Sequence, residues 1–271
     1  MSTPLLATLS RLTGWLADRR IPRPLRAPAY RTYARLTGAD LAEARPPLDG
    51  YASLGAFFVR HLVDGARPLD PDPQVLPSPC DGRVQDVSRI HEGSILQAKG
   101  RPYPVRDLLA GVGEDLDLEG GHAWTVYLSP RDYHRVHSPA QAELSDLRWV
   151  PGTFYSVQPS VLLRRPRVLC GNERAVLRLE TPRGPLLLVM VGALNVARIR
   201  VVGAEPGVDG APTGRDGALR PFERGGELAR FELGSTIVLV APPGGPEPLA
   251  DLTQEQPLRL GEAIGRWPDP A

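Results

Sequence analysis

Ten residues near the C-terminus, Phe231-Glu232-Leu233-Gly234-Ser235-Thr236-Ile237-Val238-Leu239-Val240, set a glycine-serine pair between strand-like runs. Branched and aromatic residues on both sides favour β-structure that lies in a core. Gly234 leaves its carbonyl carbon open, and the hydroxyl of Ser235 can reach back to it. In a strained turn that oxygen can attack the peptide bond and form an ester, and elimination and hydrolysis then leave an N-terminal pyruvoyl group. The plain alternative is a strand with a Gly-Ser kink.

The composition bounds what surrounds this stretch. The 271 residues suit one large domain or one domain with a helical extension. With 32 Lys and Arg against 31 Asp and Glu, the net charge gives no case for a nucleic-acid partner. Two cysteines are too few for a disulfide framework, which makes a reduced, cytoplasmic setting the default. No apolar run approaches the roughly 18 residues of a membrane span, and no signal-peptide pattern opens the chain.

The N-terminal region predicts two amphipathic helices. Thr3-Pro4 begins the first, and Gly38 stops the second, which we expect over residues 29–36. The first helix carries an apolar stripe made of Leu5, Leu6, Leu9, Leu12, Trp15 and Leu16, flanked by Arg11, Arg19 and Arg20. This pattern is typical of a helix at a membrane interface. It equally fits a helix that packs on its own domain, and the sequence leaves both alternatives open.

The rest of the chain predicts an α+β fold, with the helical N-terminal extension packed on a compact β-rich barrel or sandwich. We expect a helix over residues 53–62, in which Arg60 is solvated or paired with a carboxylate, as is Arg67 beyond it. Short β runs follow at residues 82–87, 94–98, 124–128, 176–180, 185–191, 197–202 and 227–233. Residues 203–226 are predicted to be a loop, and the last twenty or so residues a loop with one short edge strand.

Two further stretches carry candidate chemistry. Pro79-Cys80-Asp81-Gly82 predicts a turn with a carboxylate at its apex, although an ordinary Asp-Gly turn would look the same. The stretch from Ser129 to Pro139 holds His134 and His137, which one helical turn would place on the same side. Histidine titrates near neutrality, so a base or a proton donor is expected here. A metal site would need further ligands, and two structural histidines remain the plain alternative.

Taken together, these stretches resemble the phosphatidylserine decarboxylases, a pyruvoyl-dependent family. The resemblance spans about residues 50 to 242, and its most specific part is the run from Tyr127 to His137. The matching stretches, in family order, are Phe57-Phe58-Val59-Arg60, Pro79 to Val84, Ile95 to Gly100, Tyr127 to His137, Val150-Pro151-Gly152, Asn172-Glu173-Arg174, Val191-Gly192-Ala193 and Gly234-Ser235-Thr236.

The resemblance implies roles for individual residues. Asp81, His137 and Ser235 correspond to the self-processing triad, in which His137 would take the proton of Ser235 and Asp81 would orient the imidazole. His134 corresponds to the histidine of the decarboxylation step, where it would protonate the carbanion. Ser156, beside Tyr155, falls where the family has a serine in the substrate pocket.

The implied activity is self-cleavage between Gly234 and Ser235, with the new pyruvoyl group as the covalent cofactor. That group would form a Schiff base with phosphatidylserine and release CO2 to give phosphatidylethanolamine, without pyridoxal phosphate or a metal. The two chains would stay associated, and a homodimer is left open. Alternatives are a relative that decarboxylates a soluble amino acid, or a non-catalytic binding domain.

The same reading predicts how the chain is divided and where it acts. Residues 1–46 would form an amphipathic, membrane-associating segment, and residues 47–271 the catalytic domain. The expected partner is an anionic membrane surface that holds phosphatidylserine. We therefore expect peripheral attachment to the cytoplasmic side of the cell membrane.

Overall fold

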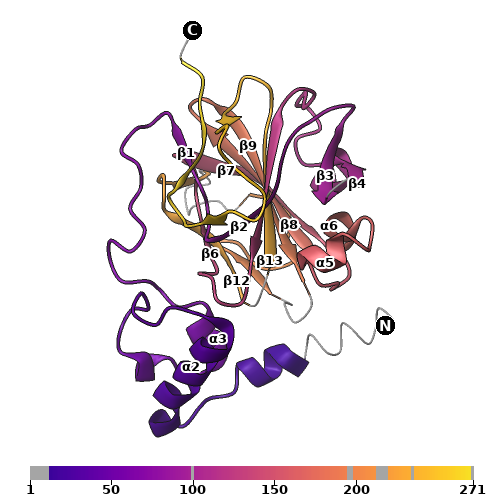
Figure 1. Ribbon diagram of the computed structural model, residues 1–271. Coiled ribbons are helices and arrows are strands. Elements are labelled where there is room, and N and C mark those ends of the chain that lie inside the picture. Colours follow the sequence, from indigo (N-terminus) through magenta and orange to yellow (C-terminus); the bar gives the residue numbers. More distant parts are fainter. Residues whose placement is uncertain (1–11, 99–100, 194–197, 212–218, 233–234, 270–271) are drawn as a thin grey trace.

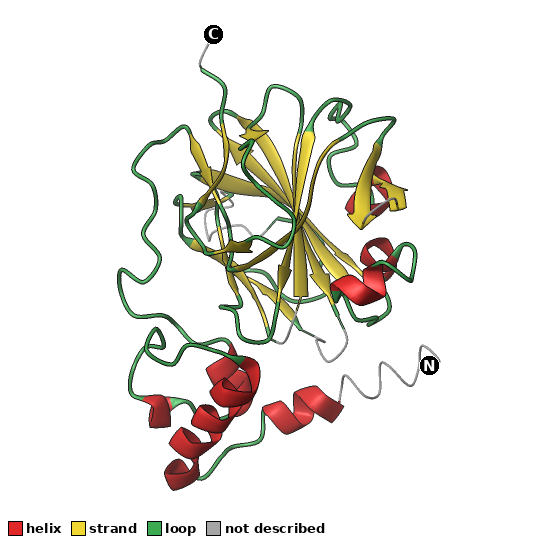
Figure 2. Cartoon of the chain, viewed as in Figure 1, coloured by secondary structure: helices red, strands yellow, loops and turns green. Residues whose placement is uncertain are grey.

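A large antiparallel sheet dominates the computed structural model, which describes residues 12–98, 101–193, 198–211, 219–232 and 235–269 (Figure 1). Figure 2 shows its strands fanning out from a common centre, with the N-terminal helices at the lower end and further short helices at one side. In order across the sheet, the strands are β11 (Arg220–Phe222), β7 (Ala142–Val150), β8 (Arg174–Thr181), β9 (Gly184–Gly192), β13 (Ser235–Ala241), β5 (His122–Leu128), β2 (Gly82–Arg89) and β15 (Pro257–Leu258).

Smaller sheets and short helices complete the domain. The three smaller sheets are β10 (Ile199–Val201), β12 (Glu227–Phe231) and β6 (Arg135–His137); β1 (Val75–Pro77), β16 (Ala263–Arg266) and β14 (Glu247–Pro248); and β3 (Ser94–Ala98) with β4 (Arg101–Pro104). The short helices here are α4 (Val105–Leu109), α5 (Pro159–Leu162) and α6 (Val168–Gly171). The α+β prediction is confirmed. In the described part of the chain the large sheet stays open, with β11 and β15 at its edges.

Strand β13 lies at the centre of the core. All seven of its residues are buried, and it pairs on both sides, with β5 and with β9. Its first residue, Ser235, lies opposite Leu128 of β5 and Gly192 of β9. The serine of the Gly-Ser pair is therefore fixed at the end of a central strand, while the predicted cleavage partner Gly234 lies outside the described residues.

The N-terminal segment forms the helical end of the molecule. Residues 12–17 are helical, and residues 1–11 of the predicted stripe lie outside the described part. Helix α2 (Arg23–Thr37) begins earlier than predicted, because prolines suit a first helical turn. It ends at Gly38, whose φ of 83° is in the left-handed region.

Helix α3 is shorter than predicted. It covers only Leu54–Phe58, with Ser53 capping its first turn, and a turn at Val59 ends it. A 3₁₀ turn, η1 (Leu48–Gly50), precedes it. The Tyr30 ring of α2 stacks on Phe57 of α3 at 4.5 Å between centroids, which joins the two helices in a small aromatic core. The described residues contain no helix long and apolar enough to cross a membrane.

Several predicted strands are confirmed, and some local predictions are wrong. The run 94–98 is β3, and four other runs fall within β2, β5, β8 and β9. His134 and His137 do not lie on a helical turn: His134 directly precedes strand β6, and His137 is its last residue. The predicted loop 203–226 includes β11, and the C-terminal region forms β14, β15 and β16 rather than one strand. These strands are two to four residues long, too short for alternation to reveal.

Candidate active site

The histidine-rich segment, residues 129–137, connects strand β5 to strand β6 and includes β6 itself. It begins after Leu128, which lies opposite Ser235, and ends in β6, which pairs with β12. The carbonyl of His134 accepts a hydrogen bond from the backbone of Phe231 at 2.9 Å. The Asp132 carboxylate accepts from both the backbone and the hydroxyl of Ser129 at 2.7 Å, which tightens the turn. The segment is thus anchored at the end of the sheet where β13 begins.

Ser235 is fully buried, and its hydroxyl has no hydrogen-bond partner among the described residues. The neighbouring Thr236 hydroxyl is buried and unpaired in the same way. Buried polar groups in proteins are nearly always paired, and leaving one unpaired costs about 1–3 kcal/mol. An unpaired nucleophilic oxygen at the start of a central strand is therefore a feature to be explained by chemistry rather than by stability.

His134 is a buried, neutral imidazole with one free nitrogen. Its Nδ1 lies 2.8 Å from the carbonyl oxygen of Asp132, and because a carbonyl can only accept, Nδ1 carries the proton. Nε2 is buried without a partner, and the ring lies 4.0 Å from that of Phe58. Burial lowers the pKa of His134, the hydrogen bond to Asp132 opposes this, and the cation of Arg60 adds to the lowering. Together they bring the pKa to about 3. In this state Nε2 can accept a proton but has none to donate.

His137 has both ring nitrogens occupied. Nδ1 lies 2.8 Å from the carbonyl of Gly225, and Nε2 lies 3.1 Å from the hydroxyl of Tyr133. The carbonyl acceptor places the proton on Nδ1, so the Tyr133 hydroxyl donates to Nε2. Burial lowers the pKa of His137, opposed by that hydrogen bond and by the charge of Glu227. The nitrogen that would act as a base is thus unprotonated and held in place.

Asp81 is buried beside His137 and bound by a cation. Arg67 donates to both of its carboxylate oxygens, at 2.8 Å and 2.6 Å, and the backbone of Leu260 adds a third bond at 2.8 Å. The turn brings Asp81 close to His137, whose backbone donates to the carbonyl of Pro79 at 2.8 Å. The position after Asp81 requires glycine, because a Cβ at Gly82 would lie 2.5 Å from a carbonyl oxygen of β5.

The fold therefore brings Asp81, His134, His137 and Ser235 to one end of the sheet, as the sequence predicted for a common site. Among the described residues, however, no hydrogen bond joins any two of Asp81, His137 and Ser235. Asp81 binds Arg67 where the triad would have it bind the imidazole, and His137 binds Tyr133. The individual roles of these residues remain predictions.

Tyr155 and Ser156 lie in a loop tied to the same end of the sheet. The buried Asn172 amide donates to the carbonyls of Tyr155 at 2.7 Å and of Gly192 at 2.8 Å, and Gly192 is the strand partner of Ser235. The guanidinium of Arg165 covers the Tyr155 ring at 3.5 Å. The Ser156 hydroxyl accepts a 3.3 Å bond from a nearby backbone amide. The loop is thus tied to the strand partner of the serine, and no hydrogen bond in the described part of the chain joins the loop to Ser235 itself.

Arg67 and Tyr133 are the site residues that sequence reasoning missed. Arg67 was expected to be solvated or paired with a carboxylate, and the structure shows the pairing, with two carboxylates. Arg60 does neither: it is 3% exposed, and its Nε and Nη1 atoms have no partner. Tyr133 lies within the histidine-rich segment, and a tyrosine hydroxyl so close to two histidines in the sequence could have indicated this contact. The described residues contain no group of three acidic, histidine or cysteine side chains suited to a metal.

A surface opening lies at the helical end of the molecule, and none of the four candidate site residues lines it. A cavity of about 440 Å³ lies between the C-terminal end of α2 and the start of the histidine-rich segment. Leu36 on its rim is 82% exposed, and Arg83 and Arg131 add two cations. The opening therefore combines an apolar rim with positive charge.

Fold and site together define a β-rich domain with a buried serine, two histidines and a carboxylate at the start of a central strand. Comparison with known proteins identifies the class: a family model described as "Phosphatidylserine decarboxylase" matches residues 54–266. The chain belongs to the phosphatidylserine decarboxylase family.

Its relatives extend the match over nearly the whole chain. A protein of Myxococcus xanthus named "Phosphatidylserine decarboxylase proenzyme" is 37% identical over 262 residues, which is 96% of this chain and 94% of the relative. Proteins of the same name from Stenotrophomonas maltophilia and Xylella fastidiosa are 39% and 42% identical. They cover 97% and 83% of this chain, and 94% and 79% of their own lengths, respectively.

Proposed function

We propose that this chain is a phosphatidylserine decarboxylase proenzyme that cuts itself before Ser235 and then converts phosphatidylserine to phosphatidylethanolamine. The observation that carries the proposal is the buried, unpaired hydroxyl of Ser235 at the start of β13. Membership of the family, and relatives that are named proenzymes, support it. A binding domain would have no use for an unpaired nucleophile held at such a cost.

The cleavage begins when Oγ of Ser235 attacks the preceding carbonyl, so that an ester replaces the amide. Elimination then leaves a carboxylate on the long chain and a dehydroalanine at the start of the short one. Addition of water to that residue releases ammonia and leaves a pyruvoyl group. The serine proton needs a base, and the unprotonated Nε2 of His137 is the proposed acceptor.

The residues at this place fit a pyruvoyl group. A serine hydroxyl without a partner can be lost without breaking a hydrogen bond, and the Ser235 side chain is fully buried. The group supplies an electron-withdrawing carbonyl that favours loss of CO2 from a bound amino acid. This chain's own part is to exclude water and to handle protons. The free Nε2 of His134 is the proposed site of proton transfer, and a donor role requires that it first take up a proton.

The cut would leave two fragments that stay together. The short fragment supplies β13, which is paired along its length with β5 and β9 of the long fragment. The short fragment also supplies β15 and β16, which pair with β2 and β1. These pairings and the buried side chains of β13 would hold the fragments without a covalent link.

We also propose peripheral attachment to the cytoplasmic face of an anionic membrane through residues 1–46. The helical residues 12–17 bury Ala17 and expose Leu12, Trp15 and Leu16 by 51–57%. The guanidinium of Arg19 covers the Trp15 ring at 3.6 Å, so an arginine lies beside the apolar face. Apolar contact and cations together favour an anionic lipid surface. The cavity at the end of α2 opens on this helical end of the molecule.

Intact-mass measurement tests the proposal. The purified wild-type chain should give two fragments that meet between residues 234 and 235, with a carbonyl at the new N-terminus that reacts with a hydrazine probe. Ser235→Ala should stay at full length and show no reaction with the probe. The cut protein should release CO2 from phosphatidylserine in mixed micelles and much less from free serine. A wild-type chain that stays whole after long incubation would contradict the proposal.

A further inference from the structure

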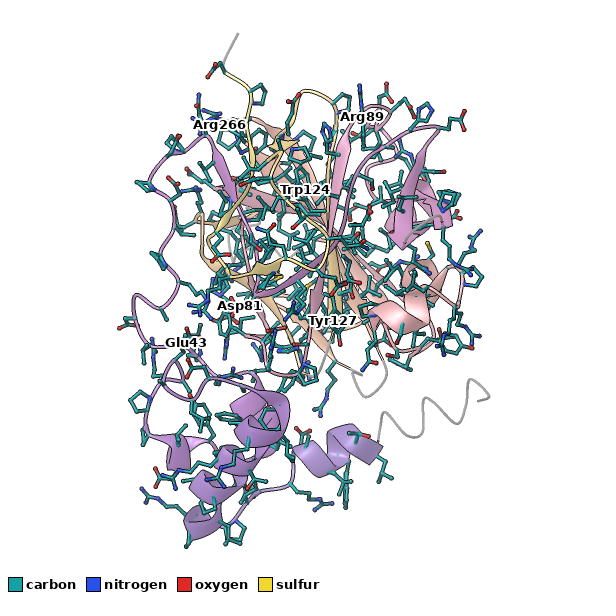
Figure 3. All side chains as sticks on the ribbon, in the orientation of Figure 1. Glu43, Asp81, Arg89, Trp124, Tyr127 and Arg266 are labelled. Atoms are coloured by element: carbon teal, nitrogen blue, oxygen red, sulfur yellow. The ribbon has the colours of Figure 1, made fainter. Side chains whose placement is uncertain are left out.

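A buried arginine lies between the N-terminal segment and the proposed processing site. Arg67 follows the short helix α3, and its side chain is only 8% exposed. It donates through Nε and Nη2 to the two oxygens of Asp81, and through Nη2 also to Glu43 at 2.8 Å. Figure 3 labels Glu43 in the N-terminal part and Asp81 directly beyond it, at the lower end of the sheet. The three side chains form one continuous chain of charges.

This arrangement differs from a surface ion pair. Exposed pairs contribute about 0–1 kcal/mol, whereas a buried charge is costly unless it is paired and hydrogen-bonded. Burial would lower the pKa of Arg67, but its hydrogen bonds with Asp81 and Glu43 raise it above its ordinary value. The hydrogen bond from Arg67 lowers the pKa of Glu43. The guanidinium and Glu43 are therefore held in their charged forms.

The bonds to Asp81 leave it with a defined free valence. A carboxylate has about four acceptor positions, two on each oxygen. Oδ1 accepts from Arg67 and from the backbone of Leu260, while Oδ2 accepts from Arg67 alone. One position on Oδ2 is left, and the bidentate contact fixes where it points. Asp81 can therefore take one further donor without losing its orientation.

Glu43 is itself fixed by the body of the protein. Its backbone carbonyl accepts from Val63 at 2.9 Å, and Ala44 forms a β-bridge with Leu62. Arg259 lies 3.3 Å from the second oxygen of its carboxylate. Arg259 directly precedes Leu260, whose backbone binds Asp81. Two routes thus connect Glu43 with Asp81, one through Arg67 and one through the segment at Leu260.

We propose that Arg67 is a positioning residue for self-cleavage and that Glu43 fixes it. Arg67 holds Asp81 in one orientation, with one acceptor position on Oδ2 free for a further donor of the processing site. Glu43 extends this control to the end of the N-terminal segment, so the part around residue 43 is needed for processing, separately from the lipid contact proposed for residues 12–16. The inference rests on the proposed self-cleavage.

The experiment follows the cleavage of freshly translated precursor on denaturing gels. We expect Arg67→Gln to slow cleavage on the order of 10- to 100-fold, because small misplacements of catalytic groups cost that much. Glu43→Gln should slow it less, and Arg67→Lys should recover part of the rate. Arg178→Gln is the matched control, since Arg178 also pairs with two carboxylates, Asp115 and Glu180, but on β8. It should cleave at the wild-type rate.

A second readout separates positioning from folding. A lost cation can be replaced by a free cation that occupies its place, whereas a loss of structure cannot be repaired in this way. Arg67→Ala should regain cleavage when millimolar guanidinium is added, but not with the same concentration of sodium chloride.

The outcomes also distinguish this inference from the proposed function. A wild-type precursor that never cleaves overturns the proposed function itself. A cleaving wild type with an Arg67→Gln variant of unchanged rate, or an Arg67→Ala variant that guanidinium does not rescue, overturns only the positioning role. Equal slowing by Arg178→Gln would overturn it as well, because the effect would then belong to any lost ion pair.

Discussion

The hydroxyl of Tyr133 lies 3.1 Å from Nε2 of His137, the nitrogen that is proposed to take the serine proton. Tyr133 packs with Leu62 and Leu260, and burial raises its pKa well above the ordinary value, so it stays a neutral donor. Together with the carbonyl of Gly225, it holds the imidazole from both sides. The ring is thus oriented by a tyrosine and a backbone carbonyl.

Tyr133→Phe should slow self-cleavage on the order of 10-fold, because the imidazole loses one of its two orienting bonds. Pulse-labelled precursor in a cell-free system gives the rate directly. The thermal midpoint should change little, since the phenyl ring fills the same apolar contact. An unchanged rate would show that the carbonyl of Gly225 alone orients the ring.

His134 and His137 should have separable roles. His137→Ala should leave the precursor uncut, because Ser235 loses its base, and Asp81→Asn should resemble it. His134→Ala should still cleave in part but release CO2 slowly, since its Nε2 is proposed to act in decarboxylation. Gels and CO2 release measure the two steps separately. If both histidine variants process and react as the wild type does, the assignment is wrong.

Ser235→Ala should block cleavage and also stabilise the precursor. The native hydroxyl is buried without a partner in the described part of the chain, so its removal should raise the free energy of unfolding by about 1 kcal/mol. Urea unfolding of Ser235→Ala can be compared with that of Ser235→Thr, which keeps a hydroxyl. A large loss of stability in the alanine variant would mean that the hydroxyl is bonded in solution.

His134 should make the fold sensitive to acid. Its pKa is about 3 in the folded chain and near its ordinary value of 6.5 when unfolded. Between these values the unfolded chain binds a proton that the folded chain does not, so stability falls as pH drops below 6.5. The slope approaches about 1.4 kcal/mol per pH unit.

Urea unfolding at pH 6.5 and at pH 4.5 tests this, in the uncut Ser235→Ala background. Adding His134→Gln should reduce the fall in stability, because glutamine does not titrate. Other groups titrate alike in both proteins, so the difference isolates His134. If stability falls equally with and without His134→Gln, then His134 does not make the fold acid-sensitive over this pH range.

The exposed face at residues 12–16 should govern lipid attachment. Replacing Leu12, Trp15 and Leu16 by glutamate should weaken flotation with anionic vesicles while self-cleavage continues, because none of them contacts the processing site. Deleting residues 1–20 should act in the same way. Val208→Glu, at another exposed apolar side chain, is the control. Equal flotation of all variants would mean that the lipid contact lies elsewhere.

Sequence reasoning reached strands that contain continuous apolar runs, such as β9. It missed β7, because charged residues interrupt the apolar ones in Ala142–Val150. It took the spacing of His134 and His137 for a helical turn, although pairing with β12 makes β6 extended there. Local pattern carries no information about such long-range pairing.

The candidate site residues were likewise predictable only where the local sequence is distinctive. The motifs identified Asp81, His134, His137 and Ser235 because each stands in a distinctive local sequence. The bond from Arg67 to Asp81 joins residues fourteen positions apart and leaves no local trace. The N-terminal contact of Glu43 is equally invisible, since only folding brings residue 43 to residue 67. Partners that act through tertiary packing need the structure.

The central position of β13 has a consequence for refolding. Before the cut, the chain folds in a unimolecular reaction. Afterwards, the strand between β5 and β9 belongs to a separate fragment, so the same structure can re-form only by association of two molecules. The unfolding midpoint of the mature protein should therefore rise with protein concentration, whereas that of the Ser235→Ala precursor should not. Maturation would make folding a one-way event at dilute concentrations.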